Sequence, residues 1–325
     1  MKIDDKNKKP PLYIFLHIPK TGGTTFSKHL LDGLKKETVI KFYSIPETGP
    51  IESLEKLKET INLLLSGKEG QEQIQAIYGH SIYLGLEKLF PDREIRYITF
   101  LRQPLNRIVS HYNFYRQKLE KGIRDKVITD LLKGEEGILS FEEAFLRNNI
   151  LHNYTFKFLA DHLFNTDLAD KPENSYHDEN VNRKILAEIK AVLNKFYFVG
   201  LTEDSEDNFL YLYHLLGVKK FFANQRRSKI FFNLTNVSEK FKSLLKAENQ
   251  LDQDLYEWAA KLNDDFKKSH PEFYRIVLLM KIRRFFYLPR RYLTSLKILA
   301  YKKSAAMKKK SEIYAKLISR LKNLI

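Results

Sequence analysis

The chain has 325 residues, of which 43% are hydrophobic and 13% aromatic, so we expect a packed globular fold and not a disordered chain. It contains no cysteine, which excludes disulfides, thiolate metal sites and cysteine nucleophiles. The formal net charge is +16, but residues 270–325 carry 15 Lys and Arg against 2 Asp and Glu, which leaves only +3 for residues 1–269. Arguments from net charge about anionic partners therefore concern the C-terminal segment.

The N-terminal sequence MKIDDKNKKP is polar and leads directly into a strand-like run, so it has neither the apolar core nor the cleavage site of a signal peptide. No stretch approaches the roughly 20 apolar residues that a membrane-spanning helix needs. We therefore expect a chain that is soluble or bound to the surface of a membrane.

Short apolar runs that end in polar turns predict buried β-strands at Leu12–His17, Ile74–Tyr78, Ile95–Leu101 and Lys195–Leu201. Helical periodicity and capping residues predict helices in several segments between and after these strands. They are Thr24–Leu34, Pro104–Gln117, Phe141–Ala160, Asn182–Asn194, the stretch from Thr202 to about Gly217, Ser238–Ala247 and Leu251–Phe266. Two polar segments are predicted to be loops, Leu119–Ser140 and Asp167–Asn180.

Strands that alternate with helices predict a parallel sheet, in which ligands bind beyond the carboxyl ends of the strands. We expect one α/β domain over residues 12–269. A polar segment over residues 1–11 precedes it, and a basic amphipathic extension over residues 270–325 follows it.

The first predicted strand ends in the loop His17-Ile18-Pro19-Lys20-Thr21-Gly22-Gly23-Thr24-Thr25. Two glycines let backbone N–H groups approach an anion, threonines add hydroxyl donors, and the following helix offers its positive N-terminus. Lys20 supplies a full positive charge, so the loop is predicted to hold a phosphate. It is not a Walker A loop, because Pro19 precedes Lys20 where that motif requires glycine.

Two further candidate sites follow other predicted strands. Arg102 stands at a strand end, and Ser110 lies about two helical turns beyond it, so both can converge on one phosphate. His80 follows the strand that ends at Gly79, and an imidazole with an ordinary pKa near 6.5 can accept a proton from an alcohol at neutral pH.

At these residues the sequence resembles the PAPS-dependent sulfotransferases, and within them the carbohydrate type that includes heparan sulfate 2-O-sulfotransferases. The resemblance is carried by HIPKTGGTTF, YGH and FLRQPLNRIVSHY, with support from NNILHNYTFKFLA and FYFVGLTEDSEDN, and it covers about Leu12 to about Phe266. It implies a three-layer, P-loop-like α/β fold with a central parallel sheet flanked by helices. It also implies PAPS (3′-phosphoadenosine 5′-phosphosulfate) as the donor and no metal.

The resemblance also assigns roles to residues. Lys20 would contact the phosphosulfate in a cradle formed with Pro19, Thr21, Gly22, Gly23, Thr24 and Thr25. Arg102 and Ser110 would bind the 3′-phosphate, and His80 would be the general base. Arg226 and Arg227 are further candidates for the 3′-phosphate side.

We therefore expect an O-sulfotransferase that acts on an acceptor hydroxyl. A carbohydrate is favoured through the resemblance, while a protein tyrosine or a lipid headgroup stays open. The alternative from another class is a catalytically silent nucleotide- or polyanion-binding peripheral membrane protein. A nucleotide-phosphate kinase is disfavoured by the position of Lys20, and no nucleic-acid partner is expected.

The C-terminal extension alternates basic pairs with Phe, Tyr, Leu and Ile, as in KIRRFFYLPRRYLTSLKILAYKK. This pattern suits an interfacial helix on anionic lipid, an anionic-polymer site or a solvated extension without a partner. We expect a cytoplasmic enzyme, which this segment can attach to the inner face of the membrane.

Overall fold

The computed structural model describes residues 9–35, 38–42, 59, 74–123, 126–134, 137–147, 151–164, 178–218 and 229–300. The side chains of its last helix are described as far as Phe286. Arg226, Arg227 and the extension beyond residue 300 lie outside the described residues.

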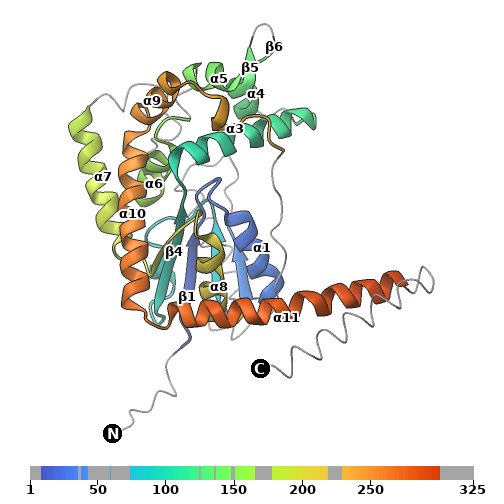
Figure 1. Cartoon of the computed structure of the whole chain (residues 1–325). Helices are drawn as coiled ribbons and strands as arrows, with labels where there is room; N and C mark the ends of the chain where they lie inside the picture. The colour runs from blue at the N-terminus through green and yellow to red at the C-terminus, as the bar shows by residue number, and fades with distance from the viewer. Residues whose placement is uncertain are drawn as a thin grey trace.

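The centre of the fold is a five-stranded sheet in the order β2-β3-β1-β4-β7, with all neighbouring strands parallel (Figure 1). Its strands are β1 (Leu12–Leu16), β2 (Val39–Lys41), β3 (Ala76–Gly79), β4 (Ile95–Leu101) and β7 (Phe198–Leu201). The predicted α/β fold with a parallel sheet is confirmed. The short edge strand β2 was not predicted, because three residues carry too little period to distinguish a strand from a loop.

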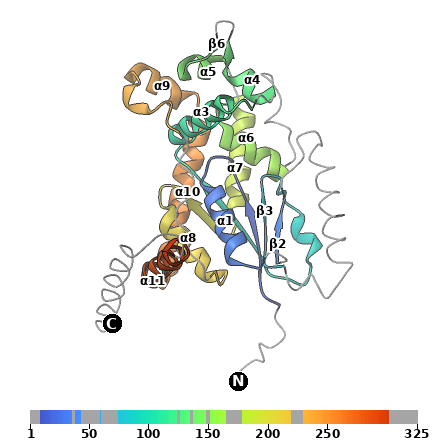
Figure 2. The same cartoon turned by 90° about the vertical axis from the view of Figure 1, so that its right-hand side faces the viewer.

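Helices cover both faces of the sheet and a further group of elements lies beyond its carboxyl edge (Figures 1 and 2). One face carries α1 (Gly23–Gly33), α8 (Ser205–Leu215) and α11 (Phe273–Ala300). The other face carries α6 (Tyr154–Phe164), α7 (Glu179–Leu193) and α10 (Gln250–Ser269). Beyond the edge lie α3 (Pro104–Glu120), α4 (Lys126–Leu132), β5 (Lys133–Gly134), β6 (Gly137–Ile138), α5 (Phe141–Arg147) and α9 (Glu239–Ala247).

Strand β1 shows why both faces must be covered. Its side chains alternate between the two faces, as the two-residue period of a strand requires. Leu12, Ile14 and Leu16 enter the core under α6, α7 and α10, whereas Tyr13 and Phe15 enter the core under α1, α8 and α11. All five side chains are buried, so the continuous apolar run in the sequence is that of a central parallel strand.

Two predictions about the elements beyond the edge were wrong. The predicted loop Leu119–Ser140 contains α4 and the antiparallel pair β5 and β6. The predicted single helix Phe141–Ala160 is divided into α5 and α6. Asn153 adopts a left-handed conformation with φ 44°. Its N–H donates to Asn249 and its side-chain oxygen accepts from the N–H of Asp252, so a tertiary contact with the start of α10 holds a non-helical residue directly before α6.

Asp252 joins three helices behind the carboxyl edge of the sheet. Its carboxylate accepts hydrogen bonds from the backbone N–H groups of Thr155 and Phe156, at 3.1 and 2.7 Å, where α6 begins. Its negative charge also opposes the lowering of the Arg107 pKa that burial causes. The guanidinium of Arg107, on α3, is fully buried and lies over the ring of Tyr154. The position of α3 therefore depends on a buried charge that Asp252 compensates.

We expect Asp252→Ala to lower the free energy of unfolding by about 3–5 kcal/mol, because it leaves Arg107 buried without its opposing charge and two N–H groups without their acceptor. Urea denaturation measures the change. Asp265→Ala, at an exposed position of the same helix, is the matched control and should change stability by less than about 0.5 kcal/mol. Equal unfolding midpoints for the two variants would contradict this role of Asp252.

Candidate active site

An open pocket of about 860 Å³ lies where β1, β3 and β4 end, the place at which parallel α/β sheets bind ligands. It is lined by the loop between β1 and α1, by His80 after β3, by Arg102 after β4, by one face of α3 and by the segment before α9. Its lining residues are His17, Pro19, Lys20, Gly22, Gly23, Thr24, Thr25, His80, Arg102, Asn106, Val109, Ser110, Asn113, Phe114, Gln117, Lys118, Lys121, Ile123, Ile230, Phe232 and Asn233.

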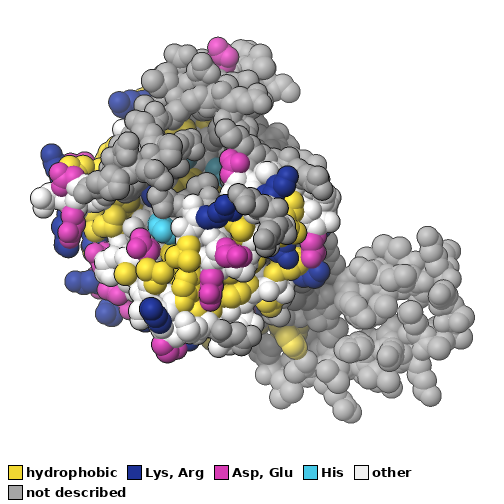
Figure 3. Space-filling view, turned by 90° about the horizontal axis from the view of Figure 1, so that it is seen from above, with side chains coloured by type: hydrophobic (Ala, Val, Ile, Leu, Met, Phe, Trp, Pro, Cys, Tyr) yellow, Lys and Arg dark blue, Asp and Glu magenta, His cyan; other side chains and the backbone are white. Residues whose placement is uncertain are grey.

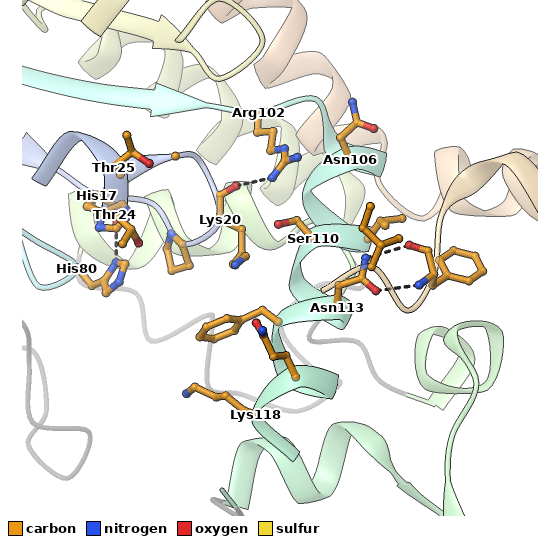
Figure 4. A pocket seen from close by; sticks show the side chains of 18 of the residues that line it. His17, Lys20, Thr24, Thr25, His80, Arg102, Asn106, Ser110, Asn113 and Lys118 are labelled. Carbon is orange, nitrogen blue, oxygen red and sulfur yellow. Dashed lines mark hydrogen bonds between the residues drawn. The ribbon is translucent and has the colours of Figure 1, made fainter. Parts of the chain in front are cut away.

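The loop between β1 and α1 has a backbone that only a few residue types adopt easily. Lys20 has φ 71° and Gly22 has φ 83°, both in the left-handed region. That conformation is ordinary for glycine but uncommon for lysine, so the surrounding contacts must hold Lys20 in place. One such contact is the hydrogen bond of 3.1 Å that the guanidinium of Arg102 donates to the carbonyl oxygen of Lys20 (Figure 4).

Gly23 begins α1 against the ring of His17. A Cβ atom added at Gly23 would lie 2.0 Å from Cδ2 of His17, which no real packing permits. The absence of a side chain therefore lets the first turn of α1, with its positive dipole end, approach the pocket beside His17.

Thr21 is the one residue of the predicted phosphosulfate cradle that does not line the pocket. Its side chain is fully buried, and its hydroxyl donates to the carbonyl oxygen of Ile18 at 2.8 Å. Its own carbonyl oxygen accepts from the hydroxyl of Thr202, which follows β7. The hydroxyl of Thr21 thus stabilises the turn, and Thr24 and Thr25 are the threonines that line the pocket.

The pocket concentrates positive charge. Lys20, Arg102, Lys118 and Lys121 line it, and its lining residues, all within the described part of the chain, include no Asp or Glu. Elsewhere on this end of the molecule acidic and basic side chains are interspersed (Figure 3). The single sign of charge is a local property of the pocket, and it suits an anionic ligand.

The ammonium group of Lys20 lies in this positive field. Its Nζ atom is 4.1 Å from the centroid of the Phe114 ring of α3. Burial, and then the charges of Arg102, Arg107 and Lys118, lower the pKa of Lys20 to about 8. A negative ligand in the pocket would reverse most of this effect, since it would replace water with an opposite charge.

Arg102 offers a donor toward an anion. Its Nε atom is buried and has no hydrogen-bond partner among the residues that the structure describes. Burial lowers the pKa of Arg102, and Glu203 opposes that shift. In the close view, Arg102 and Ser110 lie on one side of Lys20, and His80 and Thr24 lie on the other (Figure 4). The structure therefore brings the separate sequence motifs to one pocket.

His80 is held as a neutral imidazole with a defined tautomer. Its Nδ1 atom lies 2.5 Å from the carbonyl oxygen of His17, and the two rings stack with centroids 4.3 Å apart. Because a carbonyl oxygen only accepts, Nδ1 carries the proton and the lone pair lies on Nε2. Burial lowers the pKa of His80 below its ordinary value, although the hydrogen bond to His17 opposes that shift. At neutral pH the side chain can therefore accept a proton.

The sequence prediction missed most of the α3 face. Asn106, Asn113, Gln117 and Lys121 share the pocket with Ser110. Together with Ser110 they follow one another at intervals of three or four residues, which is the spacing of one helical face, so the period around Ser110 was a signal that could have identified them. Residues 230–233 gave no such signal. They reach the pocket because the side chain of Asn113 exchanges hydrogen bonds with the backbone of Phe231 and Phe232.

In the part of the chain that the structure describes, no group of three or more His, Asp or Glu side chains is arranged to hold a metal ion. None of the helices described is long and apolar enough to cross a membrane.

Residues 8–267 match the model of the Sulfotransferase family. A heparin sulfate O-sulfotransferase of Drosophila melanogaster is 23% identical over 261 residues, which cover 76% of this chain and 70% of that protein. A heparan-sulfate 6-O-sulfotransferase 2 of Gallus gallus is 25% identical over 308 residues, which cover 80% of this chain and 69% of that protein. The heparan sulfate 2-O-sulfotransferase hst-2 of Caenorhabditis elegans is 30% identical over 106 residues, 32% of each chain. Since the family model spans most of the chain, including every strand of the central sheet and all of the loops that form the pocket, this protein belongs to the sulfotransferase family.

Proposed function

We propose that this sulfotransferase takes the sulfuryl group from PAPS and transfers it to a hydroxyl group of a carbohydrate. The observation that carries the proposal is the pocket itself. It unites the β1–α1 loop, Arg102 and His80 in a positive field without acidic residues. Such a site combines two places for anionic groups with one base.

The two anion sites fit the two ends of a doubly phosphorylated nucleotide. The first turn of α1 and Lys20 would hold the 5′-phosphosulfate, because backbone N–H groups and a lysine favour negative charge there. Arg102 and Ser110 would hold the 3′-phosphate, and the unpartnered Nε atom of Arg102 supports this assignment. PAPS would supply an activated sulfuryl group on its 5′-phosphate.

The transfer step follows from the side chains around the loop. Nε2 of His80 takes the proton of the acceptor hydroxyl as the acceptor oxygen forms its bond to sulfur. The bond between sulfur and the bridging phosphate oxygen breaks at the same time, and Lys20 with the N–H groups of α1 stabilises the charge that develops on that oxygen. The products are the sulfate ester, the nucleotide 3′,5′-bisphosphate and a proton on His80.

The carbohydrate acceptor is supported by the relatives, whose names give heparin or heparan sulfate as their substrate. The pocket offers room for such an acceptor along α3, where Gln117, Lys118 and Lys121 continue the lining away from Arg102. Amide and ammonium groups of this kind bind hydroxyl and acidic groups of a saccharide. The relatives include both 2-O- and 6-O-sulfotransferases, so the acceptor class is proposed and the position of the hydroxyl is left to experiment.

We expect His80→Asn to lower turnover by roughly 10²- to 10⁴-fold, because an asparagine amide can still donate to the carbonyl oxygen of His17 but offers no base in place of Nε2. Transfer of labelled sulfate from PAPS to a panel of glycans measures turnover. Calorimetry with the nucleotide 3′,5′-bisphosphate should give an affinity close to that of the wild type. A stable variant with near-normal turnover would remove His80 from the role of base.

We expect Arg102→Ala and Ser110→Ala to weaken binding of adenosine 3′,5′-bisphosphate by about tenfold to a hundredfold, since each loses hydrogen bonds to a charged group. Binding of adenosine 5′-phosphate, which has no 3′-phosphate, should change much less, and calorimetry compares the two ligands. Ser110→Ala is the cleaner test, because Arg102 also holds the carbonyl oxygen of Lys20. Equal losses for both nucleotides with Ser110→Ala would place the 3′-phosphate elsewhere.

We expect nucleotide binding to take up about one proton near pH 9 and none near pH 7, because the pKa of Lys20 is about 8 in the free protein and rises when an anion binds beside it. Affinity should therefore fall as the pH rises through 8. Calorimetry in buffers of different ionisation enthalpy counts the protons, and Lys20→Met should abolish the uptake. Lys157, with a pKa also near 8, does not line the pocket, so uptake that persists in Lys20→Met would refute this assignment.

A further inference from the structure

Helix α11 exposes a row of large apolar side chains to solvent, here called the α11 stripe. The stripe consists of Tyr274, Leu278, Leu279, Ile282 and Phe285, which are 63%, 58%, 52%, 39% and 57% exposed. The exposed large apolar residues elsewhere in the described chain, such as Leu146 of α5 and Val181 of α7, occur singly on separate helices, strands or loops. Several such residues on one helix face form a patch, and patches of this kind mark interaction sites.

The direction of the α11 stripe is fixed by the opposite face of the helix. Phe273, Ile276, Val277 and Met280 are buried in the core shared with α8. Helical geometry places these four positions opposite the stripe, since successive residues turn by about 100° around the axis. Two ion pairs to α8 hold this orientation, Lys281 with Asp207 at 2.6 Å and Arg284 with Glu206.

The same helix is strongly basic. The segment Phe273–Ala300 contains seven Lys and Arg and no Asp or Glu. Lys281 and Arg284 are paired with α8, but Arg275 and Arg283 are exposed beside the α11 stripe. An apolar face bordered by exposed cations complements a surface that offers both hydrocarbon and negative charge.

The α11 stripe is also remote from the pocket. In both views of the fold, α3 lies at one end of the molecule and α11 at the other (Figures 1 and 2). A surface that covers α11 would leave the carboxyl edge of the sheet open to nucleotide and acceptor. The stripe is therefore not an extension of the site described above.

We propose that the α11 stripe binds this protein to the surface of an anionic lipid membrane, with the helix axis in the plane of the interface. The apolar side chains enter the boundary between headgroups and acyl chains, and the arginines beside them contact the anionic headgroups. A polyanionic saccharide would engage the arginines but would give the five apolar side chains no apolar partner. A second copy would cover the apolar side chains but would bring two basic helices together.

The test is co-sedimentation of the full chain with vesicles. We expect the wild type to bind vesicles in which about a third of the lipid is phosphatidylglycerol, and to bind pure phosphatidylcholine vesicles at least about tenfold more weakly. The double variant Leu278→Glu and Phe285→Glu should reduce binding to the anionic vesicles by at least about tenfold, because carboxylates do not enter that interface.

The matched control is the double variant Leu146→Glu and Val181→Glu, which makes the same charge change at exposed positions of α5 and α7. It should bind the anionic vesicles like the wild type. Sulfate transfer to a soluble acceptor and thermal melting should be the same in both double variants, since neither changes the pocket or the core.

Three results would overturn the proposal. The first is no binding of the wild type to anionic vesicles, and the second is equal loss of binding in the two double variants. The third is a dimer of the wild type in sedimentation equilibrium without lipid that becomes a monomer in Leu278→Glu and Phe285→Glu, because the stripe would then be the interface between two copies.

Discussion

The pocket gathers positive charges without placing a carboxylate among them, and much of the surrounding structure compensates for that arrangement. The ammonium group of Lys20 is placed against the ring of Phe114. The guanidinium of Arg102 donates to the carbonyl oxygen of Lys20, and Glu203, whose charge acts on Arg102, accepts a hydrogen bond from the N–H of Gln103. Polarisable rings and carbonyl oxygens favour a cation without neutralising it, so the field stays available for a ligand.

A second positive charge, outside the lining of the pocket, is compensated by a carboxylate. Arg107 of α3 does not line the pocket and is fully buried, and its charge is balanced by Asp252 from α10. Asp252 at the same time caps the start of α6 through two backbone N–H groups. The helix that presents Ser110 and Lys118 to a ligand is thus fixed by interactions that the ligand never contacts. Because these stabilising contacts lie outside the pocket, the positive charges that line the pocket can stay without a carboxylate partner while the fold around them is stable.

The parts of the site that the sequence predicted are the local ones. The strand, turn and helix around Lys20 lie within a short segment, so the glycines, the lysine and the threonines could be interpreted together. The role of the Thr21 hydroxyl could not, because its acceptor at Ile18 and the contact with Thr202 appear only when the turn is closed. The break at Asn153 was missed for a related reason. Asn153 takes its left-handed conformation from contacts with α10, about a hundred residues further along the chain.

Net charge gave no indication of the pocket, and the reason is geometric. The first 269 residues carry only +3, yet folding brings Lys20, Arg102, Lys118 and Lys121 to one cavity and leaves the acidic residues outside its lining. The basic excess of the sequence lies instead in residues 270–325, and α11, which is part of this segment, lies at the other end of the molecule. The two positive regions differ in what accompanies the charge. In the pocket the partners are N–H groups, hydroxyls and an imidazole, which are able to orient a polar ligand and to accept a proton from it. On α11 they are exposed apolar side chains, which do neither but favour an interface between water and hydrocarbon. Positive charge alone therefore specifies neither function, and the chemistry beside it separates the proposed anion-binding active site from the proposed membrane-binding surface.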